Sequence, residues 1–344
     1  MDIRYKPKYA RSADLVRRLA RAEGLREEIA AKASGMAWLP RARRDTLARH
    51  AHYSSRIEGN PLTLPEVEAM AEGRAIRTDD HDRTEILNYF AALRWIWEKG
   101  VKKGISESGL LKVHGILTKG LLSAKESGQY KTVQNAVFNG RAIIYRPPPP
   151  EAAQILTQSL VEWINSPEGN AEHPVVTAGV AHHRLVSIHP VMDGNGRLGR
   201  LLEAWVLYSR GFDTLHIFAL PEFYESDRQL YYSEIEMVRK GGDDLTGWLD
   251  YVAGGVVETL EKTRQRIVTG GYEKTGTGLR LSGNQNAVLN MLSKCGVMTG
   301  PEICRELGVS RAMLSKLMKP LIGGKLVERE GTTRGAVYRL PGKF

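Results

Sequence analysis

A twelve-residue segment, HPVMDGNGRLGR from His189 to Arg200, concentrates side chains that can do chemistry: a histidine, a carboxylate, three glycines, an asparagine and two arginines. Residues 173–188 before it and 201–211 after it space their apolar residues as helices do. The second of these predicted helices is closed by Gly211 at its C-terminal end. The segment is therefore predicted to form the joint between two helices.

The glycines and arginines of this segment favour phosphate binding. Gly194, Asn195 and Gly196 allow a tight turn and present consecutive N–H groups at the start of the second helix, where the helix dipole also favours an anion. Arg197 and Arg200, three residues apart, can hold two phosphate groups or two oxygens of one phosphate. This part of the segment predicts a polyphosphate cradle.

The carboxylate and the histidine add a metal ligand and a base. Asp193 is a hard oxygen ligand beside the cradle, suited to a Mg²⁺ ion that bridges phosphates. His189, fixed by Pro190, can take a proton from an attacking hydroxyl because its ordinary pKa is near 6.5. His182 and His183 lie within the preceding apolar helix and are interpreted as core residues. The predicted reaction is attack of a hydroxyl on a metal-bound polyphosphate.

A second short segment, SSRIEGN from Ser54 to Asn60, can place a carboxylate at a helix tip. Ser54 and Glu58 are four residues apart, so they share one face of a helix, and Gly59 can end that helix. A carboxylate there can reach an arginine. The alternative is an ordinary solvated helix end.

The elements that must position these residues are almost all helical. From residue 11 to about 265 the apolar residues recur with helical spacing, so the fold class is predicted to be mainly α. The exception is Thr132 to Tyr145, where two β-rich runs flank Asn139-Gly140, a strong hairpin signal. Four prolines at 147–150 then end regular structure.

The last part of the chain differs in composition and charge. Residues 266–282 are rich in Gly and Thr and predict a linker. Residues 283–344 predict three helices and a hairpin, and resemble a winged helix-turn-helix domain. That resemblance implies duplex DNA as a partner, with the helix from Ser310 to Lys319 in the major groove and contacts from Arg311, Lys316 and Arg334. The alternative is a protein-interaction or dimerisation module.

Composition sets wider limits. The chain has 344 residues and a net charge of +10, of which +6 lies in residues 281–344, an asymmetry that hints at an anionic partner. Only Cys295 and Cys304 are present, which excludes a disulfide framework and a four-cysteine zinc site. No window approaches the roughly 18 apolar residues of a membrane span. We expect a soluble, cytoplasmic protein without a membrane partner.

The segment 189–200 resembles the Fic motif, HPFx(D/E)GNGRxxR, at every defined position except Val191, where Phe is usual. The resemblance extends over roughly residues 105–255 and implies a Fic helical bundle with a small β-hairpin flap. The Val191 difference affects packing beneath the loop.

Most characterised members of this family transfer AMP from ATP to a Ser, Thr or Tyr hydroxyl of a protein. By position, the resemblance implies that His189 is the general base and Asp193 the Mg²⁺ ligand. It assigns the α- and β-phosphates of ATP to Asn195 and the Gly194–Gly196 backbone, and the outer phosphates to Arg197 and Arg200.

The resemblance also assigns roles outside the motif. The flap is expected to clamp the modified segment by strand addition, through Val137, Phe138, Asn139, Gly140 and Arg141. Tyr231 and Tyr232 fall where relatives line the adenine pocket, although both can equally be helix-packing residues. Lys131, before the flap, stands where Arg is common.

SSRIEGN resembles the family's inhibitory motif, (S/T)xxxE(G/N). A Glu58–Arg200 pair would occupy the guanidinium that the γ-phosphate needs. In some relatives the same glutamate positions a water that removes AMP, so both directions of the reaction stay open for Glu58.

The predicted organisation is an N-terminal helical region with the inhibitory helix (1–104), a Fic catalytic core (105–265), a linker (266–282) and a winged helix-turn-helix domain (283–344). The predicted function is that of an autoinhibited protein adenylyltransferase, with self-modification and a homodimer as open possibilities. The alternative is a nucleotide-sensing transcription regulator. Transfer of UMP, phosphate or phosphocholine is a third possibility, because the motif residues are common to these chemistries.

Overall fold

The computed structural model describes residues 4–33, 36, 38–139, 142–213, 215–269, 282–324, 326–331 and 336–340. It divides into two compact units, the larger made of residues 1–26 and 46–262 and the smaller of residues 27–45 and 263–344. Most of the described residues are helical, which confirms the predicted mainly α class. None of the described helices has the length and apolar character needed to cross a membrane.

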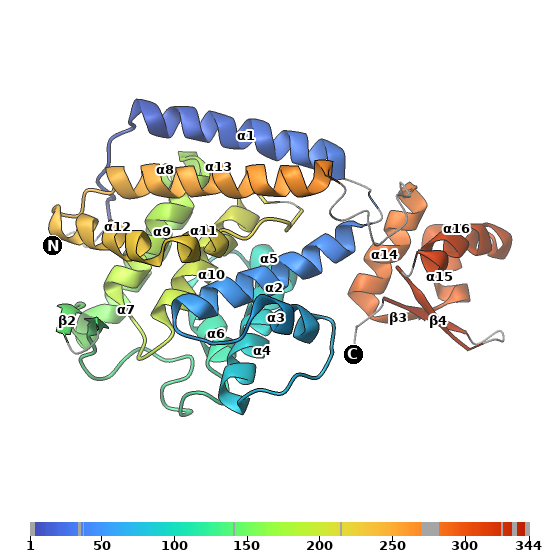
Figure 1. Ribbon diagram of the computed structural model, residues 1–344, viewed down its shortest axis with the longest axis horizontal. Helices are drawn as coiled ribbons and strands as arrows, with labels where there is room; N and C mark the ends of the chain where they lie inside the picture. The colour runs from blue at the N-terminus through green and yellow to red at the C-terminus, as the bar shows by residue number, and fades with distance from the viewer. Residues whose placement is uncertain are drawn as a thin grey trace. The chain divides into compact units, whose positions relative to one another are not determined.

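The helices before residue 269 follow one another along the chain, and the connection between Leu117 and Pro150 contains a hairpin (Figure 1). Three of them, α1, α2 and α13, run across the division between the units. In chain order the elements are α1 (Ala13–Ala33), α2 (Leu39–Ile57), α3 (Leu64–Ala71), α4 (Asp80–Trp95), the π-helical turn η1 (Ile96–Gly100), α5 (Val101–Lys103), α6 (Glu107–Leu117), α7 (Pro150–Asn165), α8 (Pro167–Ala171), α9 (Pro174–Ile188), α10 (Asn195–Ser209), α11 (Pro221–Ser226), α12 (Arg228–Lys240) and α13 (Thr246–Val268).

Helices α9 and α10 form the centre of the larger unit (Figure 1), and α6 and α7 pack against them. Nearly every residue of α9 is buried, as its continuous apolar sequence predicts. Gly199 of α10 allows the two helices to approach closely, because a Cβ atom there would lie 2.7 Å from Cγ1 of Val186. The joint between these two helices is the predicted phosphate-binding segment.

The predicted flap is an antiparallel hairpin of β1 (Val137–Asn139) and β2 (Ala142–Tyr145). Asn139 pairs with Ala142 and Phe138 with Ile143, and the register shifts between Val137 and Phe138. The predicted flap residues Gly140 and Arg141 lie outside the described residues.

The smaller unit contains a compact C-terminal fold of its own. Its elements are α14 (Gly283–Cys295), β3 (Val297–Thr299), α15 (Gly300–Leu307), α16 (Arg311–Gly323), β4 (Glu328–Glu330) and β5 (Val337–Arg339). The strands form an antiparallel sheet in the order β3-β5-β4. Apolar residues of all three helices form one core with Met298 and Val327. Three helices followed by a hairpin is the order that the sequence predicts.

The structure divides the chain differently from the predicted domains. The predicted boundary between residues 104 and 105 falls inside the larger unit. The reason is a shared core: the Trp95 ring meets the Trp205 ring edge-on at 5.6 Å, and the buried Arg197 donates to the buried Glu85. Helix α14 begins at Gly283, and most of the predicted linker lies outside the described residues.

Candidate active site

His189 ends α9 in a left-handed conformation, with φ of 52°. Its Nδ1 lies 3.2 Å from the Val186 carbonyl oxygen, which can only accept a hydrogen bond. The ring proton therefore sits on Nδ1, and Nε2 keeps its lone pair. Burial lowers the pKa of His189 to about 4, so the ring is neutral at pH 7. A neutral imidazole with a free Nε2 lone pair is the form that a general base requires.

The loop after His189 is held by amide side chains. The Asn195 side chain accepts from the Val191 N–H at 3.1 Å and donates to the Val191 carbonyl at 2.9 Å. Asn135, which precedes the flap, donates to the same carbonyl at 2.9 Å. Val191 itself is 1% exposed, so a valine fills the position where the motif usually has Phe. The Asn195 side chain thus shapes the loop, and its contact with phosphate stays a prediction.

His114 of α6 also fixes this loop, and sequence reasoning missed it. Its Nδ1 accepts the Gly128 N–H at 3.0 Å, so its Nε2 carries the proton and donates to the Asp193 carbonyl at 3.1 Å. The side chain is fully buried, and burial lowers the pKa of this histidine. His114 therefore ties the segment that leads into the flap to the predicted metal ligand.

The N-terminus of α10 already holds a carboxylate. Gly194 (φ 81°) turns the chain into α10, whose first N–H groups have no acceptor within the helix. The Glu58 carboxylate lies over this turn: a Cβ atom on Gly196 would be 2.2 Å from Glu58 Oε1. Only glycine at 196 allows an anion so near the backbone. The predicted phosphate cradle and the predicted inhibitory residue therefore meet.

Arg200 is fully buried and bonds to the predicted inhibitory helix at several points. Its Nε donates to Ser54 Oγ at 2.8 Å, and its terminal nitrogen Nη2 donates both to the Ser54 carbonyl at 2.9 Å and to Glu58 Oε1. Burial alone would raise the pKa of the Glu58 carboxyl, but Arg200, together with Arg197 and Arg228, outweighs burial and lowers the pKa. This is an ion pair between a guanidinium shielded from water and a carboxylate that keeps 30% of its side chain exposed.

Arg197 is paired as well, with the predicted metal ligand and with Glu85, which sequence reasoning did not single out. It donates to Glu85 of α4 and to Asp193 Oδ2, the latter at 3.0 Å. Asn60, the last residue of the inhibitory motif, donates to the other Glu85 oxygen at 2.6 Å. Both arginines of the Fic motif are thus bound to carboxylates, and the inhibitory segment contacts both pairs.

Tyr231 and Tyr232 differ from each other in position. Tyr231 is 1% exposed, and its hydroxyl lies 3.2 Å from Nη1 of Arg200, so its ring offers no open face for an adenine. Tyr232 is 37% exposed and lies under the Arg228 guanidinium. In the structure Tyr231 therefore packs against Arg200 and does not line an open pocket. Tyr232 is accessible to solvent.

Asp193 fits a magnesium ion only together with phosphate. Its side chain is 65% exposed, and within the described part of the chain no three His, Cys, Asp or Glu side chains group to hold a metal. Mg²⁺ commonly takes one carboxylate, substrate phosphates and waters. A single exposed carboxylate beside a phosphate cradle matches that donor set.

The flap and the segment before it are hydrogen-bonded to the backbone on either side of His189. The Tyr145 hydroxyl donates to the Ser187 carbonyl at 2.8 Å, and the Lys131 N–H donates to the Pro190 carbonyl at 2.9 Å. The Lys131 ammonium is buried between Asn135 and the Pro148 carbonyl, each at 2.8 Å. The hairpin therefore lies beside His189, with Ile143 and Ile144 each 42% exposed on β2.

The predicted DNA-contact residues belong to the smaller unit. Arg311 and Lys316 are exposed on α16, whose first turn is capped by the Ser310 hydroxyl bonding to the Met313 N–H. Arg334 lies outside the described residues.

These features define a class of protein. A hairpin beside the junction of two buried central helices, with a histidine at the end of the first and a glycine turn into the second, is the arrangement of Fic proteins. Among solved structures, a Fic family protein from Desulfovibrio desulfuricans G20 has a similar fold, with a TM-score of 0.69 and 23% identity over 99% of both chains. Fic-1 from C. elegans matches 74% of this chain and 73% of its own, with a TM-score of 0.63 and 26% identity.

Residues 104–207 match the Fic/DOC family, so this chain carries a Fic domain. It is 31% identical over 261 residues to the protein adenylyltransferase Fic of Drosophila mojavensis, covering 73% of this chain and 49% of that protein. The corresponding Drosophila melanogaster protein is also 31% identical, with 50% of its length covered. The chain thus spans about half the length of these curated relatives.

Proposed function

We propose that this protein transfers AMP from ATP to a Ser, Thr or Tyr hydroxyl of a protein and that Glu58 inhibits the transfer. The observation that supports this proposal most strongly is that the Glu58 carboxylate is paired with Arg200 and lies close to Gly196. That is the place where the motif predicts an anion. The names of the Drosophila relatives support AMP as the transferred group.

The proposed chemistry uses His189 as the base. Nε2 of His189 takes the proton of the attacking hydroxyl, whose oxygen forms a bond to the α-phosphorus of ATP. The bond from that phosphorus to the bridging oxygen breaks, and pyrophosphate leaves. The N-terminus of α10 and the two motif arginines hold the phosphates, which positions the α-phosphorus near His189.

Asp193 would hold Mg²⁺, which neutralises phosphate charge when bound. To free that carboxylate and to bind phosphate, Arg197 must release Asp193, 3.0 Å away. ATP and Glu58 would compete for Arg200, the other arginine of the motif.

The protein substrate is proposed to bind along the flap by main-chain pairing. The hairpin has only two strands, so strand β1 or β2 can accept another extended segment. A segment of a second molecule, or of this chain, is an equally suitable occupant, and self-modification is therefore included in the proposal.

Labelling with α-³²P ATP and Mg²⁺ tests this function. Wild type, Glu58→Gly and Glu58→Gly/His189→Ala are incubated with cell lysate and separated on a gel. We expect label on protein with Glu58→Gly and none with the double variant. Absence of label in all three samples, with ATP binding intact, would contradict AMP transfer; loss of label from a pre-modified protein on adding wild type would instead identify AMP removal.

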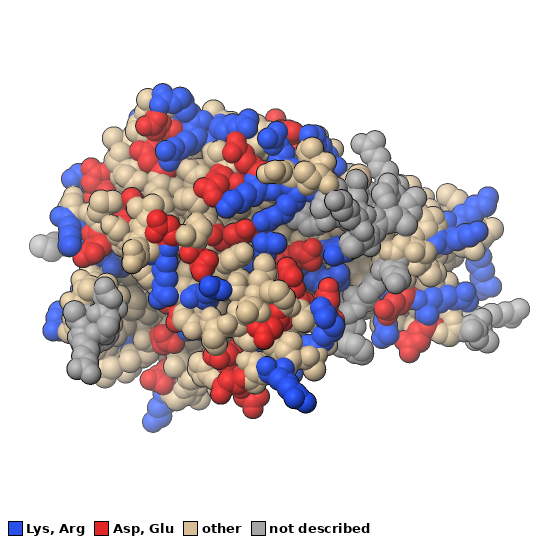
Figure 2. All heavy atoms as spheres, viewed as in Figure 1, with Lys and Arg blue, Asp and Glu red and all other residues tan. Residues whose placement is uncertain are grey.

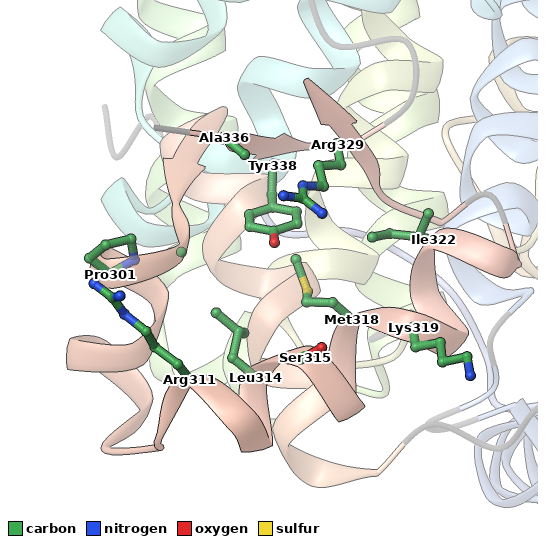
Figure 3. Close-up of a pocket in the computed structure, with 11 residues that line it drawn as sticks. Pro301, Arg311, Leu314, Ser315, Met318, Lys319, Ile322, Arg329, Ala336 and Tyr338 are labelled. Carbon is green, nitrogen blue, oxygen red and sulfur yellow. The ribbon is translucent and has the colours of Figure 1, made fainter. Parts of the chain in front are cut away.

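A second candidate function, DNA binding by the C-terminal fold, is favoured by the charges around one pocket. This pocket of about 430 Å³ lies between α16 and the sheet (Figure 3). Leu314, Ser315 and Met318 of α16 line it opposite Tyr338 and Arg329. No acidic residue lines it among the described residues.

Strand alternation explains this separation of charge. Arg329 pairs directly with Tyr338, so both point to the pocket face, whereas Glu328 pairs with Arg339 and bonds to it at 3.0 Å on the other face. Acidic and basic side chains are interspersed on the visible face of the larger unit (Figure 2). Helix α16 in contrast has no acidic residue, and its exposed cations are Arg311, Lys316 and Lys319.

A duplex mobility shift with the full chain tests DNA binding. We expect a shift at about 50 mM salt that weakens as salt rises and that is reduced in Arg311→Ala/Lys316→Ala. Arg305→Ala, an exposed arginine on α15, is the matched control. A shift that is absent, or equal in all variants, would contradict a DNA-binding regulator.

A further inference from the structure

A series of buried polar side chains leads from Arg200 away from the predicted inhibitory helix. The Arg200 Nη1 donates to the Tyr231 hydroxyl at 3.2 Å, and that hydroxyl lies 3.0 Å from Nε2 of His182 on α9. Nδ1 of His182 lies 3.2 Å from Oε2 of Glu203 on α10. The Tyr224 hydroxyl donates to the other Glu203 oxygen at 2.7 Å. The five side chains come from α9, α10, α11 and α12.

Every side chain of this series is shielded from water. The side chains of His182 and Glu203 are 0% and 2% exposed, and Tyr224 and Tyr231 are 0% and 1% exposed as residues. A buried carboxylate is costly unless donors reach it. For Glu203 the hydrogen-bond donor is the Tyr224 hydroxyl, and the His182 ring lies beside the other carboxylate oxygen. Nδ1 of His182 makes no hydrogen bond of good geometry, and the carboxylate is the acceptor at ion-pair distance from it.

The direction of each hydrogen bond follows from the arginine. A guanidinium only donates, so the Tyr231 oxygen accepts from Arg200 and its own proton must go elsewhere. Nε2 of His182 is the acceptor at 3.0 Å. The proton of the ring is then on Nδ1, beside the Glu203 carboxylate. Two hydrogen bonds therefore run one way, from Arg200 through Tyr231 to His182, whose remaining ring nitrogen faces the Glu203 carboxylate at 3.2 Å.

Tyr231 is the support of Arg200 that does not come from the inhibitory helix. Among the described residues, the guanidinium makes three other hydrogen bonds, two to Ser54 and one to Glu58, both on the α2 segment. If the tip of this segment withdraws to admit ATP, the bond to Tyr231 remains. An arginine held from behind keeps its orientation for an incoming phosphate.

We propose that His182 and Glu203 are positioning residues for nucleotide binding, which orient the Arg200 guanidinium through Tyr231. The inference rests on the proposed function, since it takes Arg200 as the ligand of the outer phosphate. It adds two residues outside the Fic motif, neither of which touches ATP. Through Tyr231 and Arg200, His182 affects the binding of the outer phosphate, one of the two phosphates that ATP has and AMP lacks.

The experiment compares ATP and AMP affinity by calorimetry, with Mg²⁺, in the full chain carrying Glu58→Gly. His182→Leu is expected to weaken ATP binding about tenfold, because it removes the acceptor that orients the Tyr231 hydroxyl toward Arg200, and AMP binding less than twofold. His182→Gln, which keeps an acceptor for the Tyr231 hydroxyl, is expected to restore most of the ATP affinity.

His183→Leu is the matched control. His183 is the neighbouring residue, is 3% exposed and also bonds to α12, through the Ile235 carbonyl at 3.2 Å, but has no bond to Tyr231 or Arg200. We expect its ATP and AMP affinities to stay within twofold of the background. Equal losses in both histidine variants, or equal losses for ATP and AMP, would overturn the proposal.

A double-variant cycle tests the route through Tyr231. Tyr231→Phe is expected to weaken ATP binding about tenfold, and adding His182→Leu to it is expected to cause no further loss. Multiplied losses would overturn the proposal. If His182→Leu does not fold, Glu203→Gln, which keeps the side-chain size, replaces it in the same comparison of ATP affinities. Since affinity is measured without turnover, these results are independent of whether Glu58→Gly transfers AMP, and absence of transfer in that background would count against the proposed function alone.

Discussion

Glu58 and Arg200 form an ion pair across the entrance of the phosphate cradle, with the arginine side chain 0% and the glutamate side chain 30% exposed. The carboxylate is at once the partner of a buried guanidinium and the anion over the first turn of α10. Both interactions are ones that a phosphate group can replace. If the proposed function is right, the pair therefore links the stability of the empty protein to its inhibition.

Removing this carboxylate should destabilise the empty protein and increase its response to ATP. Glu58→Gln is expected to lower the free energy of unfolding by about 2 kcal/mol, because the buried Arg200 loses its counter-charge. ATP with Mg²⁺ should raise the melting temperature of the variant more than that of wild type. Thermal unfolding with and without ATP measures both, and equal shifts for the two proteins would argue against competition.

The contact between Glu58 and Gly196 predicts that the cost of a substitution at Gly196 depends on whether Glu58 is present. Gly196→Ala places a methyl group where Glu58 Oε1 now lies, so the carboxylate must shift. We expect the substitution to destabilise wild type by about 1 kcal/mol more than it destabilises Glu58→Gly. Denaturant unfolding of the four proteins gives this difference; a cost independent of Glu58 would mean that the two residues are not in contact in solution.

The low pKa of His189 predicts an unusual pH profile. The base must be neutral to accept a proton, and burial lowers its pKa to about 4. In Glu58→Gly, kcat/KM for AMP transfer should hold as the pH falls from 7 to 5 and decline only nearer pH 4. Initial rates over pH 4.5–8 test this. A decline centred near 6.5 would show that the ring is more exposed to water than the structure indicates.

The sequence was sufficient for the motif loop because its chemistry is local. The helix ends on either side of His189 and Gly194, the hairpin around Asn139 and the helix tip at Glu58 all depend on neighbouring residues. The bond between Glu58 and Arg200 was expected only through the family resemblance, since 142 residues separate the two.

The supporting residues could not be predicted in the same way. Glu85, His114 and Glu203 have no local pattern that marks them, and they matter only because the fold brings them to Arg197, Asp193 and His182. His182 was interpreted as an ordinary core residue. A buried histidine and glutamate in helices of continuous apolar sequence are the signal that could have suggested a partner for each.

Buried neutral histidines predict acid sensitivity. Burial lowers the pKa of His50 and of His183 to about 3, against 6.5 when unfolded. Between these values only the unfolded chain binds the protons, so stability falls as the pH falls below about 6.5, by up to about 1.4 kcal/mol per pH unit for each group. Urea unfolding at pH 7, 6 and 5 measures the slope. His50→Gln should reduce this slope by up to about 1.4 kcal/mol per pH unit.

The most direct test of the central claim is the initial rate of α-label transfer from ATP to protein by wild type, Glu58→Gly and Glu58→Gln at equal concentrations. The account predicts that both variants exceed wild type at least tenfold and that Glu58→Gly/His189→Ala returns the rate to background. Equal rates in wild type and both variants, with all proteins folded and binding ATP, would contradict inhibition by the Glu58–Arg200 pair.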